Sequence, residues 1–181
     1  MRARVVDVST PGDPALETDR LLLRPWRATE AAVRRELWTE RDPRVPAHRR
    51  IDPDGHPTLA ELAASTPDFR DLPIGLFAVE QKTTYDVIGY CGLVDSCRGA
   101  DGEPELAFEL LRRVWGHGYA TEASLAVLDW ARSWGYERLW ATVWDWNTAS
   151  RRVLSKLGFE ETGRQPADAS GASTLMTMKQ L

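Results

Sequence analysis

A glycine-rich turn is the part of the sequence whose residue types and spacing best suit chemistry. The run Trp115-Gly116-His117-Gly118-Tyr119-Ala120 follows an apolar stretch, residues 106–111, and leads into a helical pattern. A turn between a strand and a helix directs several backbone N–H groups toward one point, in front of the positive end of the helix dipole. We therefore predict an anion site suited to a pyrophosphate, which the small residues allow to approach closely. Because a Gly-x-Gly pair also serves ordinary loops, the turn alone does not decide the function.

A second polar motif opens a helix that we predict over residues 148–157. Asn147 stands in front of this helix and Gly158 ends it. Asn is a favourable N-cap residue, and such a cap stabilises a helix by about 1 kcal/mol. Ser150 lies in the first turn of this helix. By itself, the motif therefore predicts a cap.

Two carboxylates lie on a predicted strand over residues 105–111. Alternation along the strand places Glu105, Ala107 and Glu109 on one face and the large apolar residues on the other. A carboxylate on a central strand is costly unless it is paired or faces a cleft. Glu105 is therefore either a solvated residue at the strand end, beside the turn at residues 101–102, or a functional group.

Taken together and in this order, the motifs resemble the GNAT superfamily of acyl-CoA-dependent N-acetyltransferases, and within it the ribosomal-protein (Rim-type) branch. The resemblance begins at residues 17–26, continues through residues 87–93 and the glycine turn, and ends at Gly158-Phe159. It implies one α/β (α+β) domain with a mixed, mostly antiparallel sheet that splays near Leu110 and is flanked by helices. It also implies acetyl transfer from acetyl-CoA to a primary amine by direct attack in a ternary complex.

The resemblance also implies roles for individual residues. Acetyl-CoA is expected on Glu109, Leu110 and Leu111 of the strand and on the turn residues Trp115, Gly116, His117, Gly118, Tyr119 and Ala120. Asn147 and Ser150 are expected to contact its pantetheine arm. Glu105 corresponds to the general base, which is needed because an amine is mostly protonated at pH 7.

The family's cofactor motif, Gln/Arg-x-x-Gly-x-Gly/Ala, fits this sequence in two registers. It starts at Arg113 by letters, or at Trp115 by its position between strand and helix. We prefer the second register, because the Rim-type branch accepts Trp there.

The general acid is the point at which the sequence departs from the family. Many relatives carry a Tyr that protonates the leaving thiolate, and Leu154 occupies that position here. The acid is then Ser150, a water molecule, or no group at all. Cys91 is an alternative acyl carrier that the sequence leaves open.

Composition limits the class of protein. The 181 residues suit one domain, and a hydrophobic content of 43% is enough for a core. A net charge of −4 without a basic block argues against general nucleic-acid binding.

The three scattered histidines predict no metal site, and the absence of a long apolar segment predicts no membrane span. We expect a cytoplasmic protein with free thiols at Cys91 and Cys97, whose partners are acetyl-CoA and an amine on a small molecule or a protein N-terminus. Dimers are common in the family, so a homodimer is also expected.

The chain divides into a loose N-terminal arm over residues 1–16 and a domain over residues 17–181. We predict strands at residues 21–24, 77–81, 87–93, 105–111, 139–143, 159–163 and 174–179, and helices at residues 29–38, 59–64, 120–134 and 148–157. Thr29 is the predicted cap of the first helix. Turns are expected at residues 82–86, 99–104 and 166–171.

Aromatic and basic residues suggest where an acceptor would bind. Trp140, Trp144 and Trp146 alternate, which places their rings on one side, and Trp26 or Trp38 opposite them would complete an aromatic wall. Residues 41–50 are rich in arginine and could attract an acidic acceptor, or simply be a solvated loop. Two rival functions remain: a non-catalytic acyl-CoA sensor, favoured by Leu154, and a transferase for a larger acyl group such as succinyl.

Overall fold

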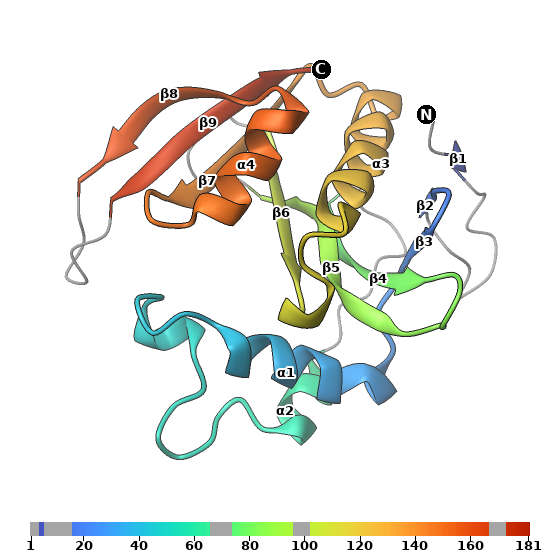
Figure 1. Cartoon of the computed structure of the whole chain (residues 1–181), viewed down its shortest axis with the longest axis vertical. Coiled ribbons are helices and arrows are strands. Elements are labelled where there is room, and N and C mark those ends of the chain that lie inside the picture. The colour runs from blue at the N-terminus through green and yellow to red at the C-terminus, as the bar shows by residue number, and fades with distance from the viewer. Residues whose placement is uncertain (1–3, 6–15, 66–73, 96–101, 167–172) are drawn as a thin grey trace.

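The computed structural model describes residues 4–5, 16–65, 74–95, 102–166 and 173–181. In these residues nine strands form one sheet, in the order β1-β2-β3-β4-β5-β6-β7-β9-β8 (Figure 1). The strands are β1 Arg4–Val5, β2 Leu16–Glu17, β3 Leu21–Arg24, β4 Gly75–Gln81, β5 Val87–Val94, β6 Glu105–Leu110, β7 Arg138–Trp144, β8 Glu160–Gln165 and β9 Thr174–Gln180. The helices are α1 Ala31–Glu40, α2 Leu59–Ala64, α3 Tyr119–Ser133 and α4 Thr148–Leu157, with 3-10 turns η1 Ala28–Glu30, η2 Ala47–Arg49 and η3 Arg112–Val114.

Neighbouring strands in the sheet are antiparallel except β6 and β7, which run parallel. Parallel neighbours need a crossover, and α3 supplies it between these two strands. The mixed, mostly antiparallel sheet flanked by helices that the sequence predicts is therefore confirmed.

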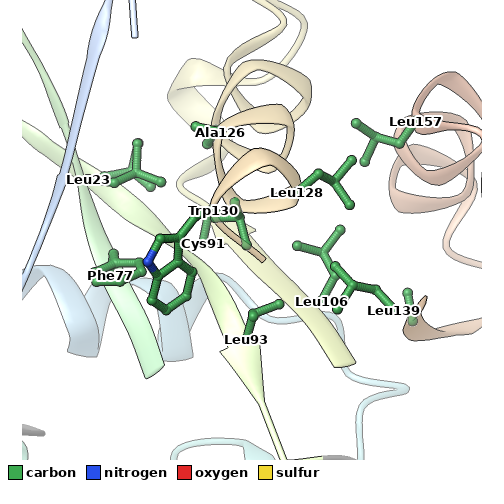
Figure 2. Packing of buried hydrophobic residues seen from close by; sticks show 14 of the residues in the cluster. Leu23, Phe77, Cys91, Leu93, Leu106, Ala126, Leu128, Trp130, Leu139 and Leu157 are labelled. Carbon is green, nitrogen blue, oxygen red and sulfur yellow. The ribbon is translucent and has the colours of Figure 1, made fainter. Parts of the chain in front are cut away.

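The larger core lies between the sheet and helices α3 and α4. Trp130 of α3 packs edge-on against Phe77 of β4, with ring centroids 5.1 Å apart, and Leu106 of β6 belongs to the same cluster (Figure 2). A smaller cluster on the opposite face includes Leu37 of α1 and Ala78 of β4. Consecutive residues Phe77 and Ala78 thus enter different cores, as the alternation of strand side chains requires.

A buried ion-pair network fixes the start of α1 to the sheet. Arg24 of β3 has 3% of its side chain exposed and pairs with Glu80 of β4 and Glu30, each at 2.5 Å. Glu30 also accepts the N–H of Arg27 at 2.8 Å. The predicted cap at Thr29 is wrong: a 3-10 turn occupies Ala28–Glu30, and α1 begins at Ala31. The reason is that the Glu30 side chain bonds back to the Arg27 N–H in the 3-10 turn ahead of α1, and Glu30 itself is the N-cap of α1, without a side-chain bond.

The predicted N-terminal arm and two predicted turns fall partly outside the described residues. Of the arm, Arg4–Val5 pairs with β2, and Leu16 lies within β2. Residues 6–15, and most of the turns at 99–104 and 166–171, lie outside the described residues. The boundary at residue 16 therefore stays a prediction.

Candidate active site

The sheet opens between its two parallel strands. β6 and β7 share one paired position, Glu105 with Trp140, where the Trp140 N–H donates to the carbonyl of Pro104 at 3.0 Å. Beyond this pair the strands diverge, so the gap begins just after Glu105, earlier than the predicted position near Leu110. A gap between two central strands leaves backbone groups on both edges free to bind a ligand.

Strand alternation decides which backbone groups of β6 face this gap. The Leu111 N–H donates to Ile88 of β5 at 2.9 Å, whereas the Pro104 carbonyl faces β7. The backbone N–H and C=O groups of the odd-numbered residues of β6 therefore face β5, and those of Phe108 and Leu110 face the gap. The backbone of Glu109, expected at the cofactor, faces β5 instead. Phe108 was missed, although the same alternation could have found it.

Glu105 reaches across the opening and contacts β7. Its Oε1 accepts the backbone N–H of Thr142 at 2.9 Å and also the Thr142 hydroxyl. In a continued parallel ladder this N–H would bond to the Leu106 carbonyl, so the carboxylate takes over a bond that the divergence breaks. In the described part of the chain Oε2 has no hydrogen-bond partner. Glu105 therefore both supports the opening and keeps one oxygen available for a proton.

Glu109 lies in a different environment, four residues further along the same face. Its Oε2 accepts bonds from Nη2 of Arg41 at 2.7 Å and from the Tyr90 hydroxyl at 2.9 Å, and Arg41 Nε donates to Oε1 at 2.9 Å. Burial and the Glu109 charge raise the pKa of Tyr90, so its hydroxyl stays protonated and donates. Both carboxylate oxygens are thus engaged, which leaves Glu109 poorly suited to take a proton from a substrate.

The glycine turn has the conformation that the sequence predicts. Gly116 and Gly118 have φ of +81° and +82°, in the left-handed region that favours glycine. Gly118 is the N-cap of α3, and it provides no side-chain cap. A Cβ at Gly116 would have no described atom within 4 Å. The N-cap thus leaves the N–H groups of the first turn of α3 without a side-chain cap, which suits an anion site.

The side chains of the turn contact one another and the rest of the protein, which supports the turn. Trp115 Nε1 donates to the Leu110 carbonyl at 2.7 Å, and its ring is half exposed. The His117 ring stacks on Tyr119, with centroids 5.8 Å apart. Tyr119 is the first residue of α3, and Ala120 packs against the larger core. Backbone N–H groups, rather than these side chains, are thus left for a ligand.

An arginine from the beginning of the domain holds the turn in place. Arg20 pairs with Glu122 of α3 at 2.6 Å, donates to the His117 carbonyl at 3.1 Å and lies 4.4 Å above the Tyr119 ring. The Thr18 hydroxyl donates to Glu122 at 2.6 Å. Burial acts to raise the pKa of Glu122, but the bonds from Thr18 and Arg20 outweigh it and lower that pKa. Sequence reasoning missed Arg20, because nothing local links it to residues about 100 positions later.

The α4 end of the site matches its predicted cap. Asn147 Oδ1 accepts the Ser150 N–H at 3.1 Å, which confirms Asn147 as the N-cap. Leu154, at the position of the family's Tyr, is 3% exposed and belongs to the larger core. Leu111, expected at the cofactor, is fully buried in the smaller cluster. Ser150 is half-buried one turn before Leu154.

Cys91 is not placed as an acyl carrier. The residue is fully buried in β5, and its Sγ lies 3.6 Å from the Ser124 hydroxyl. Burial raises the pKa of the thiol to about 12, so it carries almost no thiolate at neutral pH. Cys97 lies outside the described residues.

Arginines, rather than further tryptophans, face the expected aromatic wall. Trp144 and Trp146 stack with centroids 5.3 Å apart and an interplanar angle of 6°. Arg49 lies 5.3 Å from the Trp144 centroid and Arg44 lies 4.1 Å from that of Trp146. Trp140, the third expected member, instead donates from Nε1 to Glu103 at 2.6 Å. Trp26 belongs to the smaller core cluster, and Trp38 lies against Arg41.

The described residues contain no group of three or more His, Cys, Asp or Glu side chains that could hold a metal ion. No described helix combines the length and apolar character needed to cross a membrane.

Comparison with known proteins agrees with this geometry. The family model described as an acetyltransferase (GNAT) domain matches residues 20–160. An uncharacterized N-acetyltransferase, p20, of Bacillus licheniformis is 30% identical over 155 residues, which cover 82% of this chain and 83% of that protein.

Solved structures share the fold. A GNAT-family acetyltransferase from Bacillus anthracis gives a TM-score of 0.72 at 18% identity, covering 91% of this chain and 96% of that one. YncA from Salmonella typhimurium is a putative acetyltransferase solved with its cofactor acetyl-CoA. It gives a TM-score of 0.64 at 22% identity, covering 89% of this chain and 94% of that one. Ribosomal-protein-S5-alanine acetyltransferase from Vibrio fischeri gives a TM-score of 0.66 at 19% identity, covering 91% of this chain and 94% of that one. The chain thus belongs to the GNAT acetyltransferase family and is an acyltransferase of that family.

Proposed function

We propose that this protein transfers an acetyl group from acetyl-CoA to a primary amine, by direct attack within a ternary complex. The observation that carries the proposal is the opening between β6 and β7, which begins at Glu105 and adjoins the uncapped N-terminus of α3. An extended thioester cofactor requires both features: an anion site for its pyrophosphate and a gap in which its arm can bond to a strand edge.

The chain's own groups fit acetyl-CoA well. The backbone of residues 115–120 would hold the pyrophosphate, since a Cβ at Gly116 would have no described atom within 4 Å and one at Gly118 would meet only the Arg20 guanidinium, at 3.6 Å. Leu110, with Phe108, presents backbone N–H groups to the gap, whereas Glu109 and Leu111 support the strand from its other side. Asn147 and Ser150 would contact the pantetheine arm from α4. The cofactor supplies a thioester, whose acetyl carbonyl is the electrophile.

Proton transfer is assigned to two residues. Glu105 would accept a proton from the amine at Oε2, while Oε1 stays on Thr142. The N–H groups of the open strand edge would stabilise the negative charge on the acetyl oxygen. Ser150 would donate a proton to the departing thiolate, because Leu154 is buried and has no proton to give.

We further propose that the chain belongs to the Rim-type branch and acts in the cytoplasm. The Trp115 register of the cofactor motif supports the branch, and one structural neighbour is named as a ribosomal-protein-S5-alanine acetyltransferase. The buried free thiol of Cys91 supports a reducing compartment. A homodimer stays a prediction.

A CoA-release assay over a panel of amines and acyl-CoAs tests the function, alongside calorimetry with acetyl-CoA. We expect acetyl-CoA to bind and CoA to be released only when a suitable amine is present. Binding without release for any amine would instead support an acyl-CoA sensor, and faster release from succinyl-CoA would support a larger acyl group. Failure of acetyl-CoA to bind would overturn the proposal.

A further inference from the structure

A loop rich in arginine, residues 41–50, folds against the open side of the site; we call it the arginine loop. It contains four arginines and one aspartate. Its ends are joined by a bond from Arg41 to the Arg49 carbonyl at 2.7 Å, and Val45 in its middle is buried. The loop is therefore an ordered part of the site.

Two of the four arginines already have carboxylate partners. Arg41 pairs with Glu109 at 2.7 Å, and Arg44 pairs with Asp42 at 2.8 Å. Within the described ranges, Arg49 and Arg50 pair with no carboxylate. The arginine loop thus keeps positive charge in excess of its own anions.

Arg49 lies at the β7 side of the opening. Its guanidinium is 5.3 Å from the ring centroid of Trp144, the last residue of β7. Its charge, like that of Arg41, also acts on Tyr90 of β5 by favouring the ionised hydroxyl. Tyr90 in turn donates to Glu109 of β6, so the Arg49 charge acts on the same group of side chains as Arg41.

Two buried donors, one in the arginine loop and one in the tryptophan pair, lack an acceptor. Among the described residues, Arg50 Nε and Trp146 Nε1 are buried and have no hydrogen-bond partner. Trp146 stacks on Trp144, and the Arg44 guanidinium lies over the Trp146 ring. A buried N–H without an acceptor is costly, so both groups are candidate donors to a bound acceptor.

We infer that the arginine loop and the Trp144–Trp146 pair bind a carboxylate of the acceptor, so that the substrate is an amine that also carries a carboxylate. A planar guanidinium fork matches a carboxylate, and the stacked indoles provide an apolar surface for the connecting carbons. A free amino acid and an acidic peptide share this chemistry. The inference deepens the proposed function and rests on it.

The test compares amines that differ in one carboxylate, using CoA release with acetyl-CoA. Suitable pairs are phenylalanine with phenylalaninamide, glutamate with glutamine, γ-aminobutyrate with butylamine, and the peptide amides Ala-Glu-Ala and Ala-Gln-Ala. We expect the carboxylate member of at least one pair to have a kcat/KM about tenfold higher or more. The peptide pair separates a peptide acceptor from a free amino acid.

Variants locate the effect. Arg49→Gln should raise the KM for the carboxylate member by about 10- to 100-fold, change the neutral member less than about threefold, and leave the acetyl-CoA Kd unaltered. Arg132→Gln is the matched control, since Arg132 is an exposed residue of α3 that pairs with Asp129. Calorimetry of the same amines on the protein saturated with CoA measures acceptor binding without turnover.

Several outcomes would overturn the inference while leaving the proposed function intact. These are equal kcat/KM within every pair, a preference for O-phosphoethanolamine over the carboxylates, and a weaker acetyl-CoA Kd in Arg49→Gln. The last result would assign the arginines to the cofactor. Absence of acetyl-CoA binding in the wild type would instead remove the proposed function itself.

Discussion

The two faces of β6 are built by different means. On the α3 side, Leu106 and Leu110 enter a continuous apolar core, and the adjoining turn offers backbone N–H groups. On the α1 side, Glu105 and Glu109 meet Thr142, Arg41 and Tyr90, which come from three other elements. In the proposed function, the first face would bind the cofactor through its backbone, and the second would bind the acceptor through pairs of side chains. Backbone recognition suits a cofactor with a fixed structure, whereas side-chain pairs can be exchanged to suit another acceptor.

The strongest test of this comparison is Glu105→Gln. If Glu105 is the base, turnover should fall by roughly 10²–10⁴-fold, because an amide cannot take the proton. The acetyl-CoA Kd should stay the same, since Gln keeps an oxygen for the Thr142 N–H. Steady-state rates and calorimetry measure the two quantities.

Glu109→Gln is the matched control on the same face. It leaves Arg41 buried without its charge partner, so we expect a loss of about 2–3 kcal/mol of stability with a smaller loss of turnover. A rate within a few-fold of wild type for Glu105→Gln, with a large loss for Glu109→Gln, would reverse the two assignments.

Gly118→Glu tests the backbone face. A carboxylate at the N-cap would occupy the anion site, and φ of +82° adds strain to any side chain there. We expect the acetyl-CoA Kd to rise about 100-fold while the circular dichroism spectrum stays native. Gly118→Ala shares the strain without the charge and should weaken binding far less; unchanged affinity in Gly118→Glu would show that the phosphates lie elsewhere.

The ion pair of Arg20 with Glu122, which holds the glycine turn, makes the stability of the protein depend on pH. The pKa of Glu122 is lowered from 4.5 in the folded protein, so its stabilisation is present above that value and is lost as the pH falls through the folded pKa. Glu122→Gln should cost about 1–3 kcal/mol at pH 7 and progressively less in acid. Thermal unfolding from pH 3 to 7 measures this, with the exposed Glu160→Gln as control; a difference independent of pH would contradict it.

Ser150→Ala should have the smallest effect. A thiolate is a fairly good leaving group, so the acid step needs little help. We expect turnover to fall only a few-fold and the acetyl-CoA Kd to rise by a similar factor. A loss as large as that of Glu105→Gln would make Ser150 the principal acid, and no change in either quantity would remove it from the site.

The sequence predicts the backbone face far better than the side-chain face. The turn at Gly116 and Gly118 and the cap at Asn147 are set by neighbours in sequence, so local rules identify them. The pairing of Arg41 with Glu109 joins residues 68 positions apart, and no local pattern specifies it. The bonds of Glu105 to Thr142 at the opening of the sheet likewise join residues 37 positions apart. Thr29 failed as a cap because it lies inside the 3-10 turn that Glu30 stabilises by its bond to the Arg27 N–H.

The brace between Arg20 and Glu122 has a consequence for how the protein matures. These two residues are 102 positions apart, and Thr18 bonds to Glu122 across 104. Contacts between distant residues close late in folding, because the intervening chain must first lose its entropy. A nascent chain that has released the glycine motif but not yet docked α3 onto the first strands therefore lacks the brace. Acetyl-CoA binding would then report completed folding, and it would favour the finished protein over partly folded chains.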